Sequence, residues 1–355
     1  MKERQANADR HAQARFLIIR RDNIGDLVCT TPLIRLLRDR FPKAYIAALV
    51  NNYNKGVLAG NPHLDAIHHY TKAKHVREHG SVLGVHLDRL KLIWNLRRQR
   101  FDFIILGNSN FQAGALRFAR FIGARHVIGY VPEDGVARTI DTPIRRNAGE
   151  VIHEVIAVNR LLVPLGIDEP SPPVRVFPSQ DEAERARQVL NLSADVRVLG
   201  IHISARLPQG RWQPEKFIEL ITRLSRTGET QILLFWSPGD ENDSRHPGDD
   251  GKAKQILEHC GNLPVRAYPT RELEALIVGL SLCHTVICSD GGAMHIAAGL
   301  DRKIVALFGA DPARWHPWQA RHVLLRAAST QVSDIGVEEV MEAYGKLVPA
   351  LESIR

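Results

Sequence analysis

No apolar stretch in the sequence approaches the roughly 20 residues that a transmembrane helix needs. The first residues, up to Arg15, are polar and charged and lack the apolar centre of a secretion signal. These two absences predict a short flexible tail over residues 1–14 and a protein that resides in the cytoplasm. The sequence also has no internal repeat and no low-complexity tract.

Cysteine is scarce: the 355 residues include four, at positions 29, 260, 283 and 288. None forms a Cys-x-x-Cys pair, and no group of cysteine and histidine has the spacing of a zinc site. Cys283 and Cys288 lie in or beside an apolar run, where a reduced and buried thiol is expected. We therefore predict no metal site and no chemistry at the cysteines.

Basic residues outnumber acidic ones and give a formal net charge of +8. Such a surface suits nucleic acid, an anionic membrane face or a phosphorylated substrate. No zinc finger, helix-turn-helix or aromatic-studded basic strand is present, so we predict no nucleic-acid partner. Basic residues cluster at 72–77, 97–100 and 145–146. The second cluster is expected to be a solvated helix end, and an anionic lipid surface is the alternative for all three together.

Short apolar runs alternate with amphipathic stretches along the chain, a pattern typical of parallel sheets covered by helices on both faces. The runs expected to be strands are 16–20, 45–50, 103–106, 126–129, 196–203, 231–236, 284–288 and 304–308. The stretches expected to be helices lie around 33–40, 83–98, 112–121, 152–165, 214–227, 251–259, 272–282 and 293–300.

A proline-dense segment, Glu169–Pro173, interrupts this alternation. We therefore predict two doubly wound α/β domains, over residues 15–168 and 174–330. Their ligands are expected at the carboxyl ends of strands, facing the cleft between the domains. Residues 331–355 include an amphipathic stretch that we expect to be a helix and to pack back on the first domain.

The most informative segment is Ser289–Gly299, where an acid and two glycines separate an expected strand from an expected helix. Glycine lets a ligand approach the backbone, and the free N–H groups of a first helical turn attract an anion. A diphosphate is the anion that we expect to bind there, with Asp290 and His295 as candidate sugar contacts or acid/base groups. Many such turns bind nothing and only permit tight packing, so this motif alone leaves function open.

A second glycine turn follows the first expected strand, before a helix that begins at Leu27. Gly25 permits the tight turn. Asp26 is either the N-cap of the helix or a carboxylate that takes a proton from a bound hydroxyl.

The loop 237–250 is rich in acids but lacks the spacing of a calcium site, and its proline and glycine content favours a solvated turn. If this loop binds a ligand, Asp240 or Glu241 would meet a ribose hydroxyl, because the loop follows a strand.

Two motifs together resemble those of glycosyltransferase family 9. The first is Asn23–Asp26 with Thr31-Pro32, and the second is Ser289–Ala298 with the later Phe308-Gly309. This is the family of bacterial lipopolysaccharide heptosyltransferases, and the resemblance covers about residues 15 to 330. It implies a GT-B fold, with two Rossmann-like domains facing a deep cleft. It also implies transfer of a sugar, typically heptose from ADP-heptose, to a lipid A-core type acceptor. The family inverts the anomeric centre and needs neither metal nor cofactor, and no Asp-x-Asp metal motif occurs here.

The resemblance also assigns roles by position. Asp26 would be the general base on the acceptor hydroxyl, and Asp290 would contact the donor sugar. The backbone N–H groups that would hold the diphosphate, beside His295, are those of Gly291, Gly292, Ala293 and Met294.

The sequence departs from the family at one phosphate contact. The family usually carries Lys, one residue, then Trp-Pro, and here Gly210 stands at the lysine position. Arg206 and Arg211 are nearby and are expected to supply the charge, because arginine suits phosphate geometry. The alternative is a weakened or different donor site.

Three functions therefore remain open. The first is a heptosyltransferase that works at the inner face of the cytoplasmic membrane. The second is another nucleotide-sugar enzyme of the same fold, such as a sugar 2-epimerase. The third is an inactive member that binds sugar nucleotides.

Overall fold

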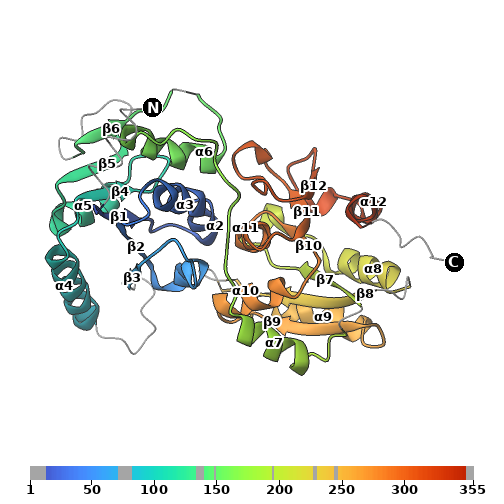
Figure 1. Cartoon of the computed structure of the whole chain (residues 1–355). Helices are drawn as coiled ribbons and strands as arrows, with labels where there is room; N and C mark the ends of the chain where they lie inside the picture. Colours follow the sequence, from blue (N-terminus) through green and yellow to red (C-terminus); the bar gives the residue numbers. More distant parts are fainter. Residues whose placement is uncertain are drawn as a thin grey trace. The chain divides into compact units, whose positions relative to one another are not determined.

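The computed structural model describes residues 13–70, 82–132, 140–147, 149–193, 196–226, 230–243 and 247–348. The chain divides into two compact units, Met1–Val174 and Arg175–Arg355, and each is built around one six-stranded parallel sheet (Figure 1). The division lies next to the proline-dense segment Glu169–Pro173. No helix within the described ranges is both long and apolar enough to cross a membrane.

The first unit has the strand order β3-β2-β1-β4-β5-β6. Its strands are β1 (Arg15–Ile19), β2 (Tyr45–Asn51), β3 (Ala66–Tyr70), β4 (Phe103–Leu106), β5 (His126–Tyr130) and β6 (Thr142–Ile144). Its helices are α2 (Ile24–Val28), α3 (Thr31–Arg40), α4 (Val82–Arg98), α5 (Ala113–Ile122) and α6 (Glu154–Asn159), with 3₁₀ helices at Asn52–Leu58 and Arg160–Leu165. In the register of the sheet, Leu17 lies beside Ala47 of β2 and Ile104 of β4.

Helices cover both faces of this first sheet. α4 and α5 pack side by side, and α3 packs with α6 (Figure 1). Alternate residues of β1 point to opposite faces, so Leu17 and Ile19 enter the core under α4 and α5 while Phe16 and Ile18 are buried on the other side. A strand buried on both faces reads as a continuous apolar run, which is why β1 is visible in the sequence.

The second unit repeats the plan with the order β12-β11-β10-β7-β8-β9. Its strands are β7 (Arg197–His202), β8 (Thr230–Trp236), β9 (Val265–Pro269), β10 (Thr285–Ser289), β11 (Lys303–Phe308) and β12 (His322–Arg326). Its helices are α7 (Gln180–Val189), α8 (Pro214–Ser225), α9 (Asp250–His259), α10 (Leu273–Ser281), α11 (Gly292–Gly299) and α12 (Val337–Leu347), with 3₁₀ turns at Pro208–Gly210, Pro312–Arg314 and Val332–Asp334.

The C-terminal helix differs from its expected place. α12 packs against β11, β12 and α8 of the second unit, and Val340, Ala343 and Leu347 lie in the core of that unit. The second unit therefore extends beyond residue 330. The apolar residues of α12, which recur at every third or fourth position, are buried within the second unit.

The predicted doubly wound architecture is confirmed in both sheets. Numbered within its own unit, each sheet has the order 3-2-1-4-5-6, which reverses between β1 and β4 in the first unit and between β7 and β10 in the second. In open α/β sheets, ligands bind at the carboxyl ends of the strands at this reversal. Each unit therefore offers one such edge, and each carries one of the two glycine turns.

Candidate functional site

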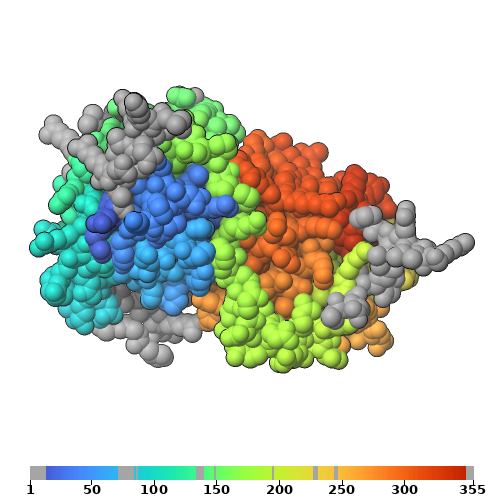
Figure 2. All heavy atoms as spheres, viewed as in Figure 1, coloured from blue at the N-terminus to red at the C-terminus, as the bar shows by residue number. Residues whose placement is uncertain are grey.

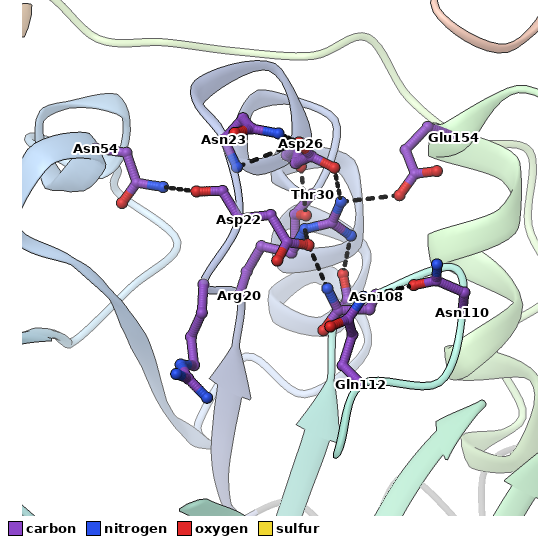
Figure 3. A network of polar contacts seen from close by, with 12 residues as sticks. Arg20, Asp22, Asn23, Asp26, Thr30, Asn54, Asn108, Asn110, Gln112 and Glu154 are labelled. Carbon is purple, nitrogen blue, oxygen red and sulfur yellow. Dashed lines mark hydrogen bonds and ion pairs between the residues drawn. The ribbon is translucent and has the colours of Figure 1, made fainter. Parts of the chain in front are cut away.

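The first candidate site is organised by Arg20, which follows β1 directly. Its side chain is 2% exposed, and its guanidinium meets three carboxylates (Figure 3). Nη2 lies 2.5 Å from Oδ1 of Asp26 and 2.9 Å from Oε1 of Glu154, and Nε lies 3.4 Å from Oδ2 of Asp22. Nη1 donates to the carbonyl oxygen of Gly107, at the end of β4. Burial lowers the pKa of Arg20, but the three carboxylates more than offset this effect and leave the pKa raised.

Asp26 is held from two sides in this cluster. While Oδ1 lies on Arg20, Oδ2 accepts hydrogen bonds from the backbone N–H of Asn23 at 3.2 Å and from its side-chain amide at 3.0 Å. Each carboxylate oxygen has two acceptor sites, so those of Oδ2 are filled while Oδ1 keeps room for one more donor. The Asp26 side chain is 15% exposed, which leaves its carboxylate open to a ligand hydroxyl.

The start of the helix differs from the sequence prediction. α2 begins at Ile24 with Asn23 as its N-cap, so Asp26 lies in the first turn and bonds back to Asn23. The expected single helix is broken after Val28, and α3 starts again with Pro32 in its first turn. Proline lacks an N–H and fits only a first turn, which explains the break.

The second candidate site lies at the reversal in the other sheet. The turn after β10 has the predicted strand–Gly-Gly–helix form, with α11 beginning at Gly292. The N-cap Gly291 has φ of +155°, a conformation that suits glycine, and a Cβ built there meets no atom within 4 Å. The space above this turn is therefore open, and the first N–H groups of α11 have no acceptor within the helix.

Asp290 and His295 differ in their surroundings. The Asp290 side chain is exposed, yet the protein atoms around it raise the pKa of its carboxyl to about 6 by desolvation. His295 is 4% exposed and packs edge-on to Trp315, with ring centroids 6.0 Å apart. Its burial favours a role in holding the turn.

The predicted cations lie on the loop after β7, which is the neighbour of β10 in the sheet. Nε of Arg211 donates to the carbonyl oxygen of Ala205 at 3.2 Å, and Arg206 is exposed. A Cβ at Gly309, after β11, would lie 3.3 Å from the carbonyl oxygen of Gln209. β7 and β11 are the two neighbours of β10 in the sheet, and the loops that follow them approach each other beside the turn after β10. The expected donor residues therefore share one edge of the sheet.

Sequence reasoning missed Lys252, a buried cation beside this loop. Its Nζ donates to the carbonyl oxygen of Ile203 at 3.0 Å and lies 5.0 Å from the ring centroid of Phe217. Burial, more than the positive charge of Arg211, lowers the pKa of Lys252 to about 8. The sequence offers no signal for it, because Lys252 belongs to no motif and is buried only once α9 packs.

The acids of the loop after β8 serve local structure. Oδ1 of Asp240 accepts from the backbone N–H of Asn242 at 2.8 Å, and Oε1 of Glu241 accepts from the backbone N–H of Lys252 at 3.1 Å. Both residues are exposed, as expected of a solvated loop. No group of three or more histidine, cysteine or acidic residues is placed to hold a metal ion anywhere in the described ranges.

Two of the three basic clusters can be placed. The cluster at 97–100 spans the last two residues of α4 and the two that follow, and the side chain of Arg146 donates to the carbonyl oxygen of Glu150 at 2.9 Å. The cluster at 72–77 and the predicted tail, apart from Gln13 and Ala14, lie outside the described residues.

Comparison with known proteins adds to this geometry. Residues 89–344 match glycosyltransferase family 9 (heptosyltransferase). Lipopolysaccharide heptosyltransferase 3 of Escherichia coli is 26% identical over 351 residues, which cover 92% of this chain and 95% of that protein.

Two solved structures share the fold. A glycosyl transferase family 9 protein from Veillonella parvula superposes with a TM-score of 0.80 at 19% identity, over 94% of this chain and 97% of its own. ADP-heptose lipopolysaccharide heptosyltransferase II of Escherichia coli gives a TM-score of 0.76 at 21% identity, over 94% and 98%. The fold is therefore the GT-B fold. Since the family match extends over most of its length, the chain belongs to glycosyltransferase family 9 and is a glycosyltransferase of the heptosyltransferase type.

Proposed function

We propose that this protein transfers heptose from ADP-heptose to a lipid A-core type acceptor, with inversion at the anomeric carbon and without a metal ion. The observation that carries the proposal is the Asp26 carboxylate, which Arg20 and Asn23 hold in place at the carboxyl edge of the first sheet. ADP-heptose appears in the name of the Escherichia coli enzyme of the same fold.

In the proposed reaction Asp26 accepts the proton of an acceptor hydroxyl. That oxygen attacks the anomeric carbon of heptose from the side opposite the diphosphate, the bond from this carbon to the phosphate oxygen breaks, and ADP leaves. One displacement at the carbon inverts its configuration. The ion pair with Arg20 fixes the direction of the base, so little reorganisation is needed when the proton moves.

The leaving diphosphate gains negative charge as the bond breaks. In this proposal the N–H groups at the start of α11 bind that charge, and Arg206 and Arg211 take the place of the lysine that Gly210 lacks. Asp290 contacts the donor sugar, and Asp240 or Glu241 meets the ribose. Stabilisation by fixed dipoles and cations replaces a metal ion, and no cofactor takes part.

The acceptor in this proposal is anchored in a membrane by its lipid. The protein therefore works in the cytoplasm at the inner face of the membrane, and its net charge of +8 suits the phosphates of such an acceptor.

Thermal unfolding with ADP, UDP, GDP and CMP tests the donor, and a transfer assay with ADP-heptose and heptose-free lipopolysaccharide core tests the reaction. A ligand that binds only the folded state stabilises it by about 2.7 kcal/mol at a hundred times its Kd. Selective stabilisation by ADP, with a heptosylated product of inverted configuration, is expected. Selective binding of UDP or GDP would change the donor, and binding without turnover would favour the inactive member.

A further inference from the structure

Four large apolar side chains lie on the surface of α4 and α5. Of the ten that are exposed in the described part of the chain, these four lie on two neighbouring helices. The exposed fractions are 57% for Leu87, 62% for Leu90, 58% for Trp94 and 61% for Phe121. In the space-filling view the side chains of α4, coloured teal, form part of the surface of the first unit (Figure 2).

The packing of α4 within its own unit does not use this stripe. Leu96 is fully buried in the core under the helix, and Leu92 and Ile93 pack against that core. Leu87, Leu90 and Trp94 are spaced by three and four residues, so they share a different face of α4. A helix that is apolar on a second, exposed face usually has a partner outside its own domain.

Positive charge surrounds the stripe. Exposed cations on the two helices are Lys91, Arg97, Arg98, Arg117 and Arg120, and Asp88 is the exposed acid. The guanidinium of Arg98 lies 4.6 Å from the ring centroid of Trp94. Nη1 of Arg97 donates to the carbonyl oxygen of Phe121 at 3.2 Å, which joins the two helices into one surface. We name the four apolar residues and these five cations the α4–α5 face.

We propose that the α4–α5 face docks on the surface of an anionic lipid bilayer. Trp94 and Phe121 enter the boundary between headgroups and acyl chains with the two leucines. The arginines and Lys91 extend their charged ends to the lipid phosphates, while their stems cover apolar surface. A second copy of the chain fits less well, because a symmetric contact would bring each cationic rim against itself. The charge complementarity thus favours an anionic lipid surface.

The direction of α4 connects this surface to the candidate base. β3 and β4 are parallel, so α4 between them runs against the strands, from their carboxyl edge to their amino edge. Leu87, near the start of α4, is therefore toward the edge where Asp26 lies. This step rests on the proposed function, because only a lipid-anchored acceptor makes a bilayer beside that edge useful; the apolar stripe and its cationic rim do not depend on it.

Flotation with vesicles tests the proposal on the full-length protein. Vesicles of phosphatidylcholine with phosphatidylglycerol are compared with phosphatidylcholine alone, at low and high salt. One double variant, Leu90→Ser with Trp94→Ser, removes apolar side chains of the α4–α5 face. The other, Lys91→Glu with Arg98→Glu, reverses two of its positive charges. Controls on the second unit are Val189→Ser, which changes a side chain 85% exposed on α7, and Arg185→Glu with Lys254→Glu.

We expect the wild-type protein to bind the anionic vesicles, with affinity that falls at high salt. Each double variant should bind at least about tenfold more weakly, and the controls should bind like the wild type. Wild-type protein that stays unbound, or variants that bind as tightly as wild type, would overturn the proposal. A concentration-dependent dimer in sedimentation without vesicles, lost in the same variants, would instead make this face a contact between copies.

Transfer to a water-soluble, lipid-free core acceptor separates this proposal from the function. The double variants should keep that activity and lose rate only with vesicle-embedded acceptor. If the wild type transfers no heptose to either acceptor but still binds anionic vesicles, the proposed function fails while the docking surface stands.

Discussion

Arg20 and Glu154 form a buried ion pair of 2.9 Å although 134 residues separate them in the chain. Both side chains are 2% exposed. One follows the first strand of the sheet, and the other opens α6 near the end of the first unit (Figure 3). The pair fixes the guanidinium that in turn holds Asp26, so a residue of α6 determines the orientation of the candidate base.

We expect Glu154→Gln to destabilise the protein by about 3 kcal/mol, because removal of one partner leaves buried charge on Arg20 less compensated. Urea unfolding measures this loss. The control is Asp301→Asn, which breaks the exposed pair with Arg175 and should cost less than about 1 kcal/mol. Equal stability of Glu154→Gln and wild type would show that Asp22 and Asp26 suffice to compensate Arg20.

Asp26→Asn should retain ADP binding and lower the rate of heptose transfer by about a hundredfold or more, because asparagine cannot accept the proton. The matched control is Asp22→Asn, which removes another carboxylate from the same guanidinium and should keep the rate within about tenfold. Single-turnover transfer and ADP titration measure the two quantities. Unchanged turnover of Asp26→Asn would disprove the general-base role.

The interior strands could be predicted from the sequence, while the four outermost strands could not. β1, β4, β7 and β10 are buried on both faces and read as apolar runs. The strands without a prediction, β3, β6, β9 and β12, are the edges of the two sheets. They are half-exposed and carry residues such as His68, Pro143 and Arg266. Polar residues and proline keep an edge strand from pairing with another chain, but they also interrupt the apolar pattern by which a strand is recognised in the sequence.

The candidate site shows the same limit. Asp290 could be proposed because it stands with glycine directly after the apolar run of β10, and Asp26 because it stands beside Gly25 in the turn that follows β1. Glu154 and Lys252 could not, because their roles depend on contacts with Arg20 and Ile203 that only the folded chain makes. A charged residue within an apolar stretch, as Glu154 is between Ile152 and Val155, is a weak signal of such pairing.

Arg211→Ala should weaken ADP binding by about tenfold, through the loss of a charged hydrogen bond to phosphate. Arg206→Ala should lose less, because Arg211 is oriented by its bond to Ala205 and Arg206 is not. A Cβ at Gly210 meets one atom within 4 Å, the Cβ of Ala205 at 3.3 Å, so a lysine is accommodated once Ala205 moves by a few tenths of an ångström. Gly210→Lys should therefore restore part of the affinity of Arg211→Ala, as measured by calorimetry. Full affinity in both arginine variants would place the phosphate contact elsewhere.

Gly291→Ala should destabilise the second unit by about 1 to 3 kcal/mol, because alanine is strained at φ of +155° even though space is open around it. It should also weaken ADP binding, since the turn at the start of α11 shifts. Gly345→Ala in α12 is the opposite case: it has ordinary helical backbone and open space, and should stabilise by about 0.5 to 1 kcal/mol. Thermal unfolding of both variants measures the contrast, and equal shifts would contradict it.

Lys252 should make stability rise with pH above neutrality. Burial lowers its pKa from 10.5 to about 8, so between these values the unfolded chain binds more protons at this site than the folded chain does. Stability then increases with pH, by about 2 kcal/mol between pH 7 and pH 10 from this group. Lys252→Met should lose this slope, and Lys252→Arg should lose it too, because arginine stays charged throughout the range. Urea unfolding of the three proteins at both pH values isolates the effect as a difference between wild type and variants. Parallel pH profiles for all three would show that the ammonium titrates alike in the folded and unfolded chain.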